Sequence, residues 1–252
     1  MKNKLLIPLG NVGESDYFCE LEKVHHLLVS GCSGSGKSIF LHQAFKTLMT
    51  KYTGKDVQIV LIDSKHTEFY TYEGNSRIVG DKPIYEPKEV EKFLAELLDE
   101  MNKRFQLFNE ASCLNFERYN ESHEDNRLAR IVVIIDEYAD VVYETKKAST
   151  KYIEELTCKG HGAGIHFIIA TQCPRQDVIS PIIKANMIGR MAFKVADAQD
   201  SRFILGKKGA ENLAGRGEFL YTDLNTVEPV KGQVPYDKEA YQFISGAWKE
   251  FV

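Results

Sequence analysis

The most constraining feature of the sequence is the stretch GCSGSGKS at residues 31–38, which directly follows the apolar run HHLLVS. It fits the pattern G-x-x-x-x-G-K-[ST], in which glycines let the backbone turn so that successive N–H groups point at phosphate oxygens. Apolar residues then recur at helical spacing: Phe40, Leu41, Ala44, Phe45 and Leu48. A strand, a phosphate-binding loop and a helix must therefore follow one another, which favours a sheet covered by helices.

Four further apolar runs predict the rest of that sheet. They read VQIVLID at 57–63, IVVIID at 131–136, IHFIIA at 165–170 and MAFKV at 191–195. Strands that are apolar on both faces need helices on both sides, and such strands are typical of parallel sheets. The sequence therefore predicts an α/β fold with a central, mostly parallel β-sheet flanked by helices.

Other segments predict the surroundings of the sheet. An apolar stripe over 90–108 predicts a long helix that begins near Pro87, where the fixed φ of proline is tolerated. The start LLIPLG and the segment 217–234 read as extra edge strands, and a last helix is expected over about 237–250. The segment 111–130 is expected to be part helix and part polar loop.

Length and composition indicate one globular domain over 1–252. The 252 residues are 43% hydrophobic and 27% charged, which is enough to bury a sizeable core. We divide the chain into an edge strand and lead-in at 1–24, a core at 25–222, and a C-terminal strand and helix at 223–252. The net charge of −4 means that any contact with nucleic acid must be local or shared among several copies, because dedicated nucleic-acid binders are usually basic.

The cysteines and the N-terminus predict a cytoplasmic protein. The five cysteines are odd in number and form no C-x-x-C pair, which argues against a disulfide framework and a zinc ribbon. The opening MKNKLLIPLG is too short for a signal peptide. No apolar run approaches the roughly 20 residues that a membrane helix needs.

The phosphate loop predicts an ATP site with Mg²⁺. Lys37 should reach the β- and γ-phosphates, and the hydroxyl of Ser38 should bind the metal ion. The end of the following helix adds its positive N-terminus. The predicted nucleotide-binding residues are Gly31, Cys32, Ser33, Gly34, Ser35, Gly36, Lys37, Ser38 and Ile39. Cys32 lies inside this loop, whose helix end and lysine favour a thiolate, so alkylation of Cys32 is expected to block nucleotide binding and bound ATP to protect it; the alternative is that Cys32 is a small filler facing the sheet.

Polar residues at the ends of two other strands predict the catalytic groups. Asp136 ends the run IVVIID, at the edge of an open α/β sheet where ligands bind, and is the expected second partner of Mg²⁺. Glu137 follows and can polarise the attacking water as a general base. Gln172 comes after IHFIIA, where an amide could sense the γ-phosphate or hold that water. The adjacent acidic pair favours an ATPase over a kinase.

Six motifs in order resemble those of the FtsK/SpoIIIE family of ATPases. They read HHLLVSGCSGSGKS, VLIDSKHTEF, IVVIIDEYAD, GAGIHFIIATQ, DVISPIIKANMIGRMAFKV and DSRFILGKKGAENLAGRGEFLY, and they span nearly the whole chain. The resemblance implies a RecA-like P-loop core, a hexameric ring, and ATP-driven movement of double-stranded DNA. It also implies a bare motor domain, with a membrane-anchored or relaxosome-like protein as a possible partner.

The resemblance implies roles for two arginines and shows four departures. Arg190 and Arg202 match family arginines that reach a neighbouring subunit's nucleotide. Four positions differ from the usual family residues: Ser64, His66, His161 and Cys173 stand where the family has proline, glycine, arginine and arginine. The two missing arginines bear on the coupling between sites or on the DNA-contacting surface.

Basic residues in loops are candidates for DNA contacts in the pore of such a ring. A few cations per subunit, repeated around a ring, could follow phosphates despite the acidic total charge. The candidates, expected beyond strand ends near the nucleotide, are Lys146, Lys147, Lys159, Arg175 and Lys184.

Two alternative functions stay open. A type VII protein-secretion ATPase shares these motifs, although the stretch KHTEF in place of a glycine-rich segment favours the DNA branch. A nucleotide-dependent scaffold with little turnover is the second alternative, and the intact Lys37, Asp136 and Glu137 count against it.

Overall fold

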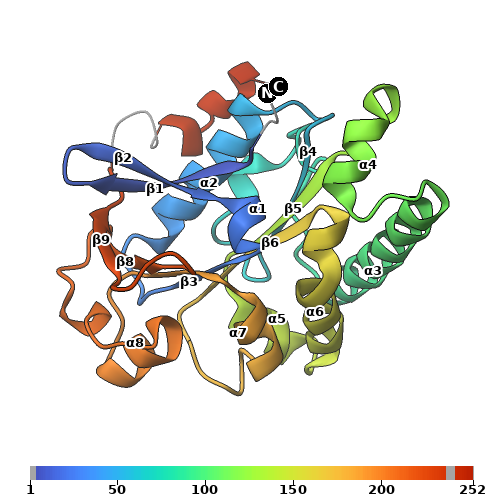
Figure 1. Ribbon diagram of the computed structural model, residues 1–252. Coiled ribbons are helices and arrows are strands. Elements are labelled where there is room, and N and C mark those ends of the chain that lie inside the picture. The colour runs from blue at the N-terminus through green and yellow to red at the C-terminus, as the bar shows by residue number, and fades with distance from the viewer. Residues whose placement is uncertain (1–3, 237–241, 252) are drawn as a thin grey trace.

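The structure, a computed structural model, describes residues 4–236 and 242–251 (Figure 1). Within these residues, one nine-stranded sheet has the order β2-β1-β9-β8-β7-β3-β6-β5-β4. The strands are β1 Leu6–Val12, β2 Ser15–Glu20, β3 Leu27–Ser30, β4 Val57–Ile62, β5 Arg130–Ile135, β6 Ile165–Thr171, β7 Gly189–Ala192, β8 Glu218–Thr222 and β9 Val230–Gln233. The α-helices are α1 Leu21–Val24, α2 Lys37–Lys51, α3 Pro87–Glu110, α4 Phe116–Ser122, α5 Tyr138–Glu144, α6 Ala148–Lys159, α7 Pro181–Asn186 and α8 Ala198–Leu205.

The central strands confirm the predicted parallel sheet. β4, β5, β6, β3 and β7 run parallel, and every residue of β3 and β6 is buried. The run MAFKV was placed too late, because the strand begins at Gly189 and ends at Ala192.

Helices cover both faces of the sheet (Figure 1). One core cluster joins α2 to the sheet through Phe40, Phe45 and Leu48, and it includes Phe243 and Trp248 from the C-terminal segment. The other cluster joins α3, α5, α6, α7 and α8 to the opposite face. Two buried layers of apolar side chains therefore hold the central strands between helices, as their sequence requires.

The helices predicted after the phosphate loop and from Pro87 have their expected positions, as α2 and α3. Pro87 is the first residue of α3, and the segment 111–130 contains α4 and a 3-10 helix at Glu124–Asn126. The last predicted helix lies partly outside the described residues, because 237–241 are not described. The described part of that segment ends in a 3-10 helix at Ala247–Phe251.

Antiparallel strands extend the sheet beyond β7. β8 and β9 form the pair predicted over 217–234, and β1 joins β9 at the pair Asn11 and Gln233. The sequence did not predict β2, which pairs with β1 as a hairpin. Three of its six residues SDYFCE are exposed and only Cys19 is buried, so the strand lacks the apolar pattern that reveals the others.

In the described residues, no helix combines the length and apolar character needed to cross a bilayer.

Candidate nucleotide-binding site

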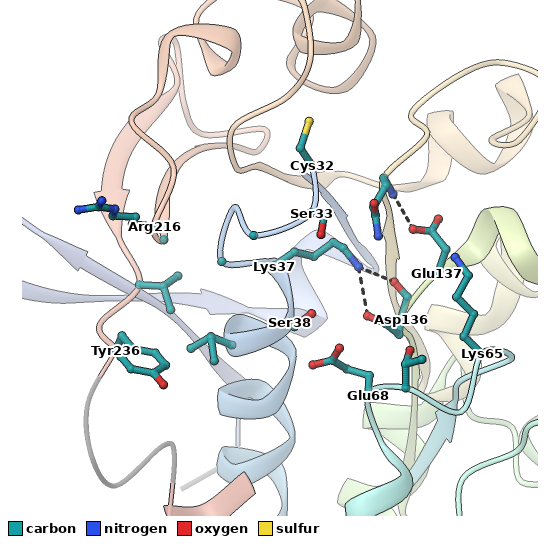
Figure 2. Close-up of a pocket in the computed structure, with 17 residues that line it drawn as sticks. Cys32, Ser33, Lys37, Ser38, Lys65, Glu68, Asp136, Glu137, Arg216 and Tyr236 are labelled. Atoms are coloured by element: carbon teal, nitrogen blue, oxygen red, sulfur yellow. Dashed lines mark hydrogen bonds and ion pairs between the residues drawn. The ribbon is translucent and has the colours of Figure 1, made fainter.

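The predicted site residues meet at one edge of the parallel sheet. The phosphate loop follows β3, Asp136 and Glu137 follow β5, and Gln172 follows β6. Since these strands are parallel neighbours, their carboxyl ends lie together. A cavity of about 650 Å³ opens there, between the loop and the two acidic residues (Figure 2).

Close backbone contacts shape the phosphate loop. A Cβ on Gly31 would lie 2.7 Å from Cβ of Phe193 and 2.5 Å from Ser35 Oγ, so a larger residue there would force the neighbouring chain to shift. Gly36 has φ of 112°, and a Cβ on it would lie 2.6 Å from Cα of Gly217. The amide of Gly217 also donates to the carbonyl of Ser35 at 2.8 Å. The turn before β8 therefore supports the loop from outside, a contact that the motif alone does not reveal.

Lys37 is paired with Asp136 across the cavity floor. Its Nζ donates to the carbonyl oxygen of Asp136 at 3.0 Å and to Oδ1 at 3.1 Å, and both side chains are buried. Burial raises the pKa of Asp136, and the positive charge of Lys37 partly offsets that rise. The structure thus brings together the lysine and the aspartate that the sequence assigned to phosphate and metal.

Glu137 is held by hydrogen bonds from two strand ends. Its Oε1 accepts from Thr171 Oγ1 at 2.6 Å and from the amide of Ala139 at 3.2 Å. Its Oε2 accepts from the amide of Gln172 at 2.8 Å. A carboxylate has about four lone-pair positions, so one remains for a water. The sequence pointed to Gln172 but missed its neighbour Thr171, whose hydroxyl makes the shortest of these contacts.

The oxygen donors near α2 fit a magnesium ion. Ser38, Asp136 and Glu68 line the same part of the cavity, and all three offer the hard oxygens that Mg²⁺ prefers. Within 4–236 and 242–251, no three His, Cys, Asp or Glu side chains converge into a metal cage. This arrangement suits Mg²⁺, which is usually bound by one or two carboxylates together with substrate phosphates and waters.

The end of the cavity away from Glu137 is lined by apolar side chains. Of these side chains, the sequence predicted only Ile39. Val234 and the ring of Tyr236 line this end, and Arg216 stands nearby in the turn before β8 (Figure 2). Figure 2 shows Arg216 and Tyr236 on the side of the phosphate loop away from Glu137 and Lys65. Val234 and Tyr236 lie outside every quoted motif, and Arg216, which lies in the sixth motif, was given no role there, so the sequence marked none of the three as site residues. The cavity therefore has an apolar end, a cationic middle and an acidic end.

Cys32 does not have the environment predicted for it. Figure 2 shows its sulfur pointing away from Lys37. Burial and the negative charge of Asp200 raise the pKa of Cys32. The expectation of a stabilised thiolate is therefore wrong, because burial and Asp200 outweigh the groups that lower the pKa of Cys32.

The two candidate arginines differ in their surroundings. Arg190 donates to three carbonyl oxygens of its own chain, those of Met187 at 2.9 Å, Lys184 at 2.9 Å and Ile204 at 3.4 Å. Arg202 is exposed on α8 and makes no side-chain hydrogen bond or ion pair with the described residues. Arg190 thus ties α7 and α8 to β7, while the guanidinium of Arg202 is available to another molecule.

The candidate DNA-contacting residues do not all lie near the cavity. Lys146 and Lys147 are exposed in the turn between α5 and α6, and Arg175 is exposed beyond the carboxyl end of β6. Lys184 is half-buried, with its Nζ 4.2 Å from the ring centroid of Phe203. Lys159 directly precedes the turn into β6 and pairs with Glu155 at 2.9 Å. Its expected position near the nucleotide is wrong, because this turn lies at the amino ends of the strands.

Two of the departures from the family pattern lie in aromatic stacks. His66 has φ of 55° and stacks on Tyr85 with ring centroids 3.6 Å apart. His161 stacks on His25 with ring centroids 3.8 Å apart, at the amino edge of the sheet. Cys173 is half-buried after β6, and its amide donates to the hydroxyl of Thr171 at 3.0 Å.

Comparisons of the sequence with known proteins give consistent matches. The FtsK/SpoIIIE family profile matches residues 1–131. The DNA translocase FtsK of Caldanaerobacter subterraneus subsp. tengcongensis is 36% identical over 239 residues, which cover 94% of this chain and 34% of that protein. The DNA translocase SpoIIIE of Bacillus subtilis is 37% identical over 240 residues, which cover 91% of this chain and 30% of that protein. The chain thus spans about a third of the length of these relatives.

Solved structures share the fold. The pCW3 conjugation coupling protein TcpA, in its monomer form with ATPγS, superposes with a TM-score of 0.84 and 26% identity, over 100% of this chain and 70% of that one. EssC (ATPases 2 and 3) of Geobacillus thermodenitrificans has a TM-score of 0.78 at 20% identity, over 98% of this chain and 48% of that one. The second likeness shows the fold alone.

Proposed function

The chain belongs to the FtsK/SpoIIIE family, and from this premise we propose that it is an ATP-hydrolysing motor that moves double-stranded DNA. The observation that carries the proposal is the convergence of Lys37, Asp136 and Glu137 on one cavity under the phosphate loop. A cation for phosphate, a carboxylate near the Ser38 hydroxyl and a second carboxylate with room for a water are the groups that phosphoryl transfer to water requires.

The cavity suggests how ATP lies in it. The apolar end at Val234 and Tyr236 suits a base, and the loop amides and Lys37 suit the phosphates. Lys37 then exchanges its contacts with Asp136 for phosphate oxygens, which releases the carboxylate of Asp136. This orientation places the γ-phosphate at the acidic end, beside Glu137.

Glu137 is the proposed general base. Thr171 and the amide of Gln172 fix its carboxylate, and its remaining lone pair can accept a hydrogen bond from the attacking water. The side chain of Gln172 lines the cavity and can contact the same water. Ser38 and Asp136 would hold Mg²⁺, which would neutralise charge on the phosphates.

The proposal of a ring that moves DNA is supported by the relatives. The curated relatives with 36–37% identity are named DNA translocases, and TcpA is named a conjugation coupling protein. We infer a homo-hexameric ring in the cytoplasm, in a mobile-element, plasmid or phage setting, with a membrane-anchored or relaxosome-like partner. The exposed Arg202 is the better placed of the two candidate arginines to reach a neighbouring subunit.

The alternatives have less support. The Type VII Secretion ATPase EccC of Thermomonospora curvata shares the fold at 16% identity, well below the identity to the DNA translocases. A scaffold with little turnover would not need Glu137 to be held by three hydrogen bonds at the edge of the cavity.

The ATPase rate with and without duplex DNA, measured together with the mass in solution, tests the proposal. A DNA motor is stimulated by duplex DNA, and its specific activity rises with protein concentration as subunits assemble. A secretion ATPase is indifferent to DNA, and a scaffold hydrolyses almost nothing. Specific activity that stays constant from dilute monomer to high concentration would exclude a site shared between subunits.

A further inference from the structure

Glu68 lies in the stretch VLIDSKHTEF, where the sequence gave it no role, and a folded loop presents it to the cavity. Asp63 at the end of β4 is 2% exposed, and its carboxylate accepts from the amides of Thr67 at 3.3 Å, Glu68 at 2.8 Å and Phe69 at 2.9 Å. These three bonds wrap the loop around one buried carboxylate. The backbone of Glu68 is therefore held in place before any ligand binds.

The side chain of Glu68 is held in turn by a buried histidine. Nε2 of His42 lies 2.9 Å from Oε1 of Glu68, and Nδ1 of His42 lies 2.7 Å from the hydroxyl of Tyr72. His42 is 4% exposed and stands one helical turn after Ser38 in α2, so the two side chains lie on the same face of that helix. Tyr72 packs edge-on against the ring of Trp248, with centroids 6.1 Å apart.

The electrostatics place Glu68 beside the predicted metal ligands. Burial would raise the pKa of Glu68, but His42, Ser38 and Lys37 together lower it. The charge of Glu68 contributes to the raised pKa of Asp136. Figure 2 shows the carboxylate of Glu68 pointing toward Asp136 and Ser38, on the far side of Lys37 from the apolar end.

We propose that Glu68 is a third protein group for the divalent cation, acting through a water of that ion, and that His42 is its positioning residue. This inference rests on the proposed function, since it concerns the same nucleotide site. When Lys37 contacts phosphate, Asp136 and Glu68 are the two carboxylates that face Ser38, and Mg²⁺ commonly keeps waters between itself and such groups. A tie between α2 and the loop, without any role toward metal, is the competing explanation.

Metal affinity, and not turnover, separates the two explanations. Mn²⁺ binding in the presence of ADP is measured by electron paramagnetic resonance, and affinity for a fluorescent ATP analogue is measured with Mg²⁺ and with EDTA. Glu68→Gln keeps a hydrogen-bonding group for His42 but removes the charge. We expect it to weaken Mn²⁺ binding by about 10- to 100-fold, with a smaller loss for His42→Gln. Affinity in EDTA should be unchanged or higher.

Controls keep the outcomes distinct. Glu100→Gln removes another ion-paired glutamate, the partner of Arg104 on α3, and should change neither affinity. Thermal melting checks that each variant is folded, and Glu68→Asp, which keeps the charge on a shorter side chain, should bind Mn²⁺ with intermediate affinity. Wild-type Mn²⁺ affinity in folded Glu68→Gln would overturn the inference alone. Failure of the wild-type protein to bind the nucleotide in Mg²⁺ would overturn the proposed function.

Discussion

The hydroxyl of Thr171 donates a 2.6 Å hydrogen bond to Oε1 of Glu137, so that the ends of β5 and β6 share one carboxylate. The adjacent amide of Gln172 occupies the other oxygen at 2.8 Å. A residue at the end of one strand thus sets the direction of the proposed base at the end of the next.

Thr171→Val should lower kcat by about tenfold and leave ATP affinity unchanged. Valine has the shape of threonine but lacks the donor, so Glu137 loses its shortest bond while the phosphate loop keeps its contacts. Thr171→Ser restores the hydroxyl and should recover most of the rate. Steady-state kinetics of both variants, with equilibrium binding, provide the check. An equal loss of kcat in Thr171→Val and Thr171→Ser would show that Thr171 acts through packing and not through its hydroxyl.

Glu137→Gln should bind ATP normally and hydrolyse it about 10²- to 10⁴-fold more slowly. The amide still fills the space between Thr171 and Gln172, but it cannot take a proton from water. Single-turnover hydrolysis and a nucleotide-binding assay measure the two effects separately. Glu144→Gln, at the exposed other end of α5, is the control and should hydrolyse ATP at the normal rate. Normal hydrolysis by Glu137→Gln would remove Glu137 from the mechanism.

Substitution of the two candidate arginines should have different effects, on stability for Arg190 and on the ATPase rate for Arg202. Arg190→Ala removes three hydrogen bonds to carbonyls of its own chain and should lower the free energy of unfolding by about 1–3 kcal/mol. Arg202→Ala should leave stability unchanged and lower the ATPase rate of assembled subunits by about 10³-fold or more. Urea denaturation measures the first effect and ATPase assays measure the second.

Mixing Arg202→Ala with Lys37→Ala subunits should restore activity if the arginine acts in trans, and no recovery would speak against a shared site.

Cys32 should react slowly with iodoacetamide at neutral pH. Its raised pKa leaves little thiolate, and labelling should increase as the pH rises above the usual thiol range. Peptide mapping by mass spectrometry can follow it beside the exposed Cys158, which we expect to be labelled first. Rapid modification of Cys32 at pH 7 would contradict the raised pKa.

Acid should destabilise the protein through histidines at the amino edge of the sheet. Burial lowers the pKa of His166 to about 3 and that of His26 well below its usual value. Nδ1 of His26 accepts from the amide of Phe167 at 3.0 Å, so protonation would break that bond. His25 and His161, which stack on each other, also have lowered pKa values. Burial lowers both, and the charge of His161 lowers the pKa of His25 further.

The sign of this effect follows from the depressed folded-state pKa. The contribution of His166 to the free energy of unfolding is fully present above the unfolded-state pKa of about 6.5. It is lost as the pH falls toward the folded-state pKa of about 3, by ~1.4 kcal/mol per pH unit for each proton taken up on unfolding. His166→Asn can keep the bond to the carbonyl of His25 and should flatten the dependence of urea stability on pH between 7 and 5. His123→Asn, outside this cluster, is the control. An unchanged slope in His166→Asn would show that His166 does not titrate on unfolding.

Much of the site was readable from the sequence because its groups are attached to strand ends. Lys37, Asp136 and Glu137 each follow an apolar run within a few residues, and parallel neighbours bring such positions to one edge. The same runs predicted the central strands, since burial on both faces leaves a continuous apolar signal. β2 was not predicted, because an edge strand in which only Cys19 is buried carries no such signal.

Contacts between distant segments were decided only by the tertiary structure. Gly217 supports the phosphate loop through Ser35 and Gly36, and His42 orients Glu68, yet nothing in either local sequence requires these pairs. The side chain of Arg190 turned toward its own chain because the carbonyls at the end of α7 lie within its reach. Local patterns determine which backbone forms and where each strand ends. Side-chain partners depend on packing between elements, which hydrophobic periodicity does not encode.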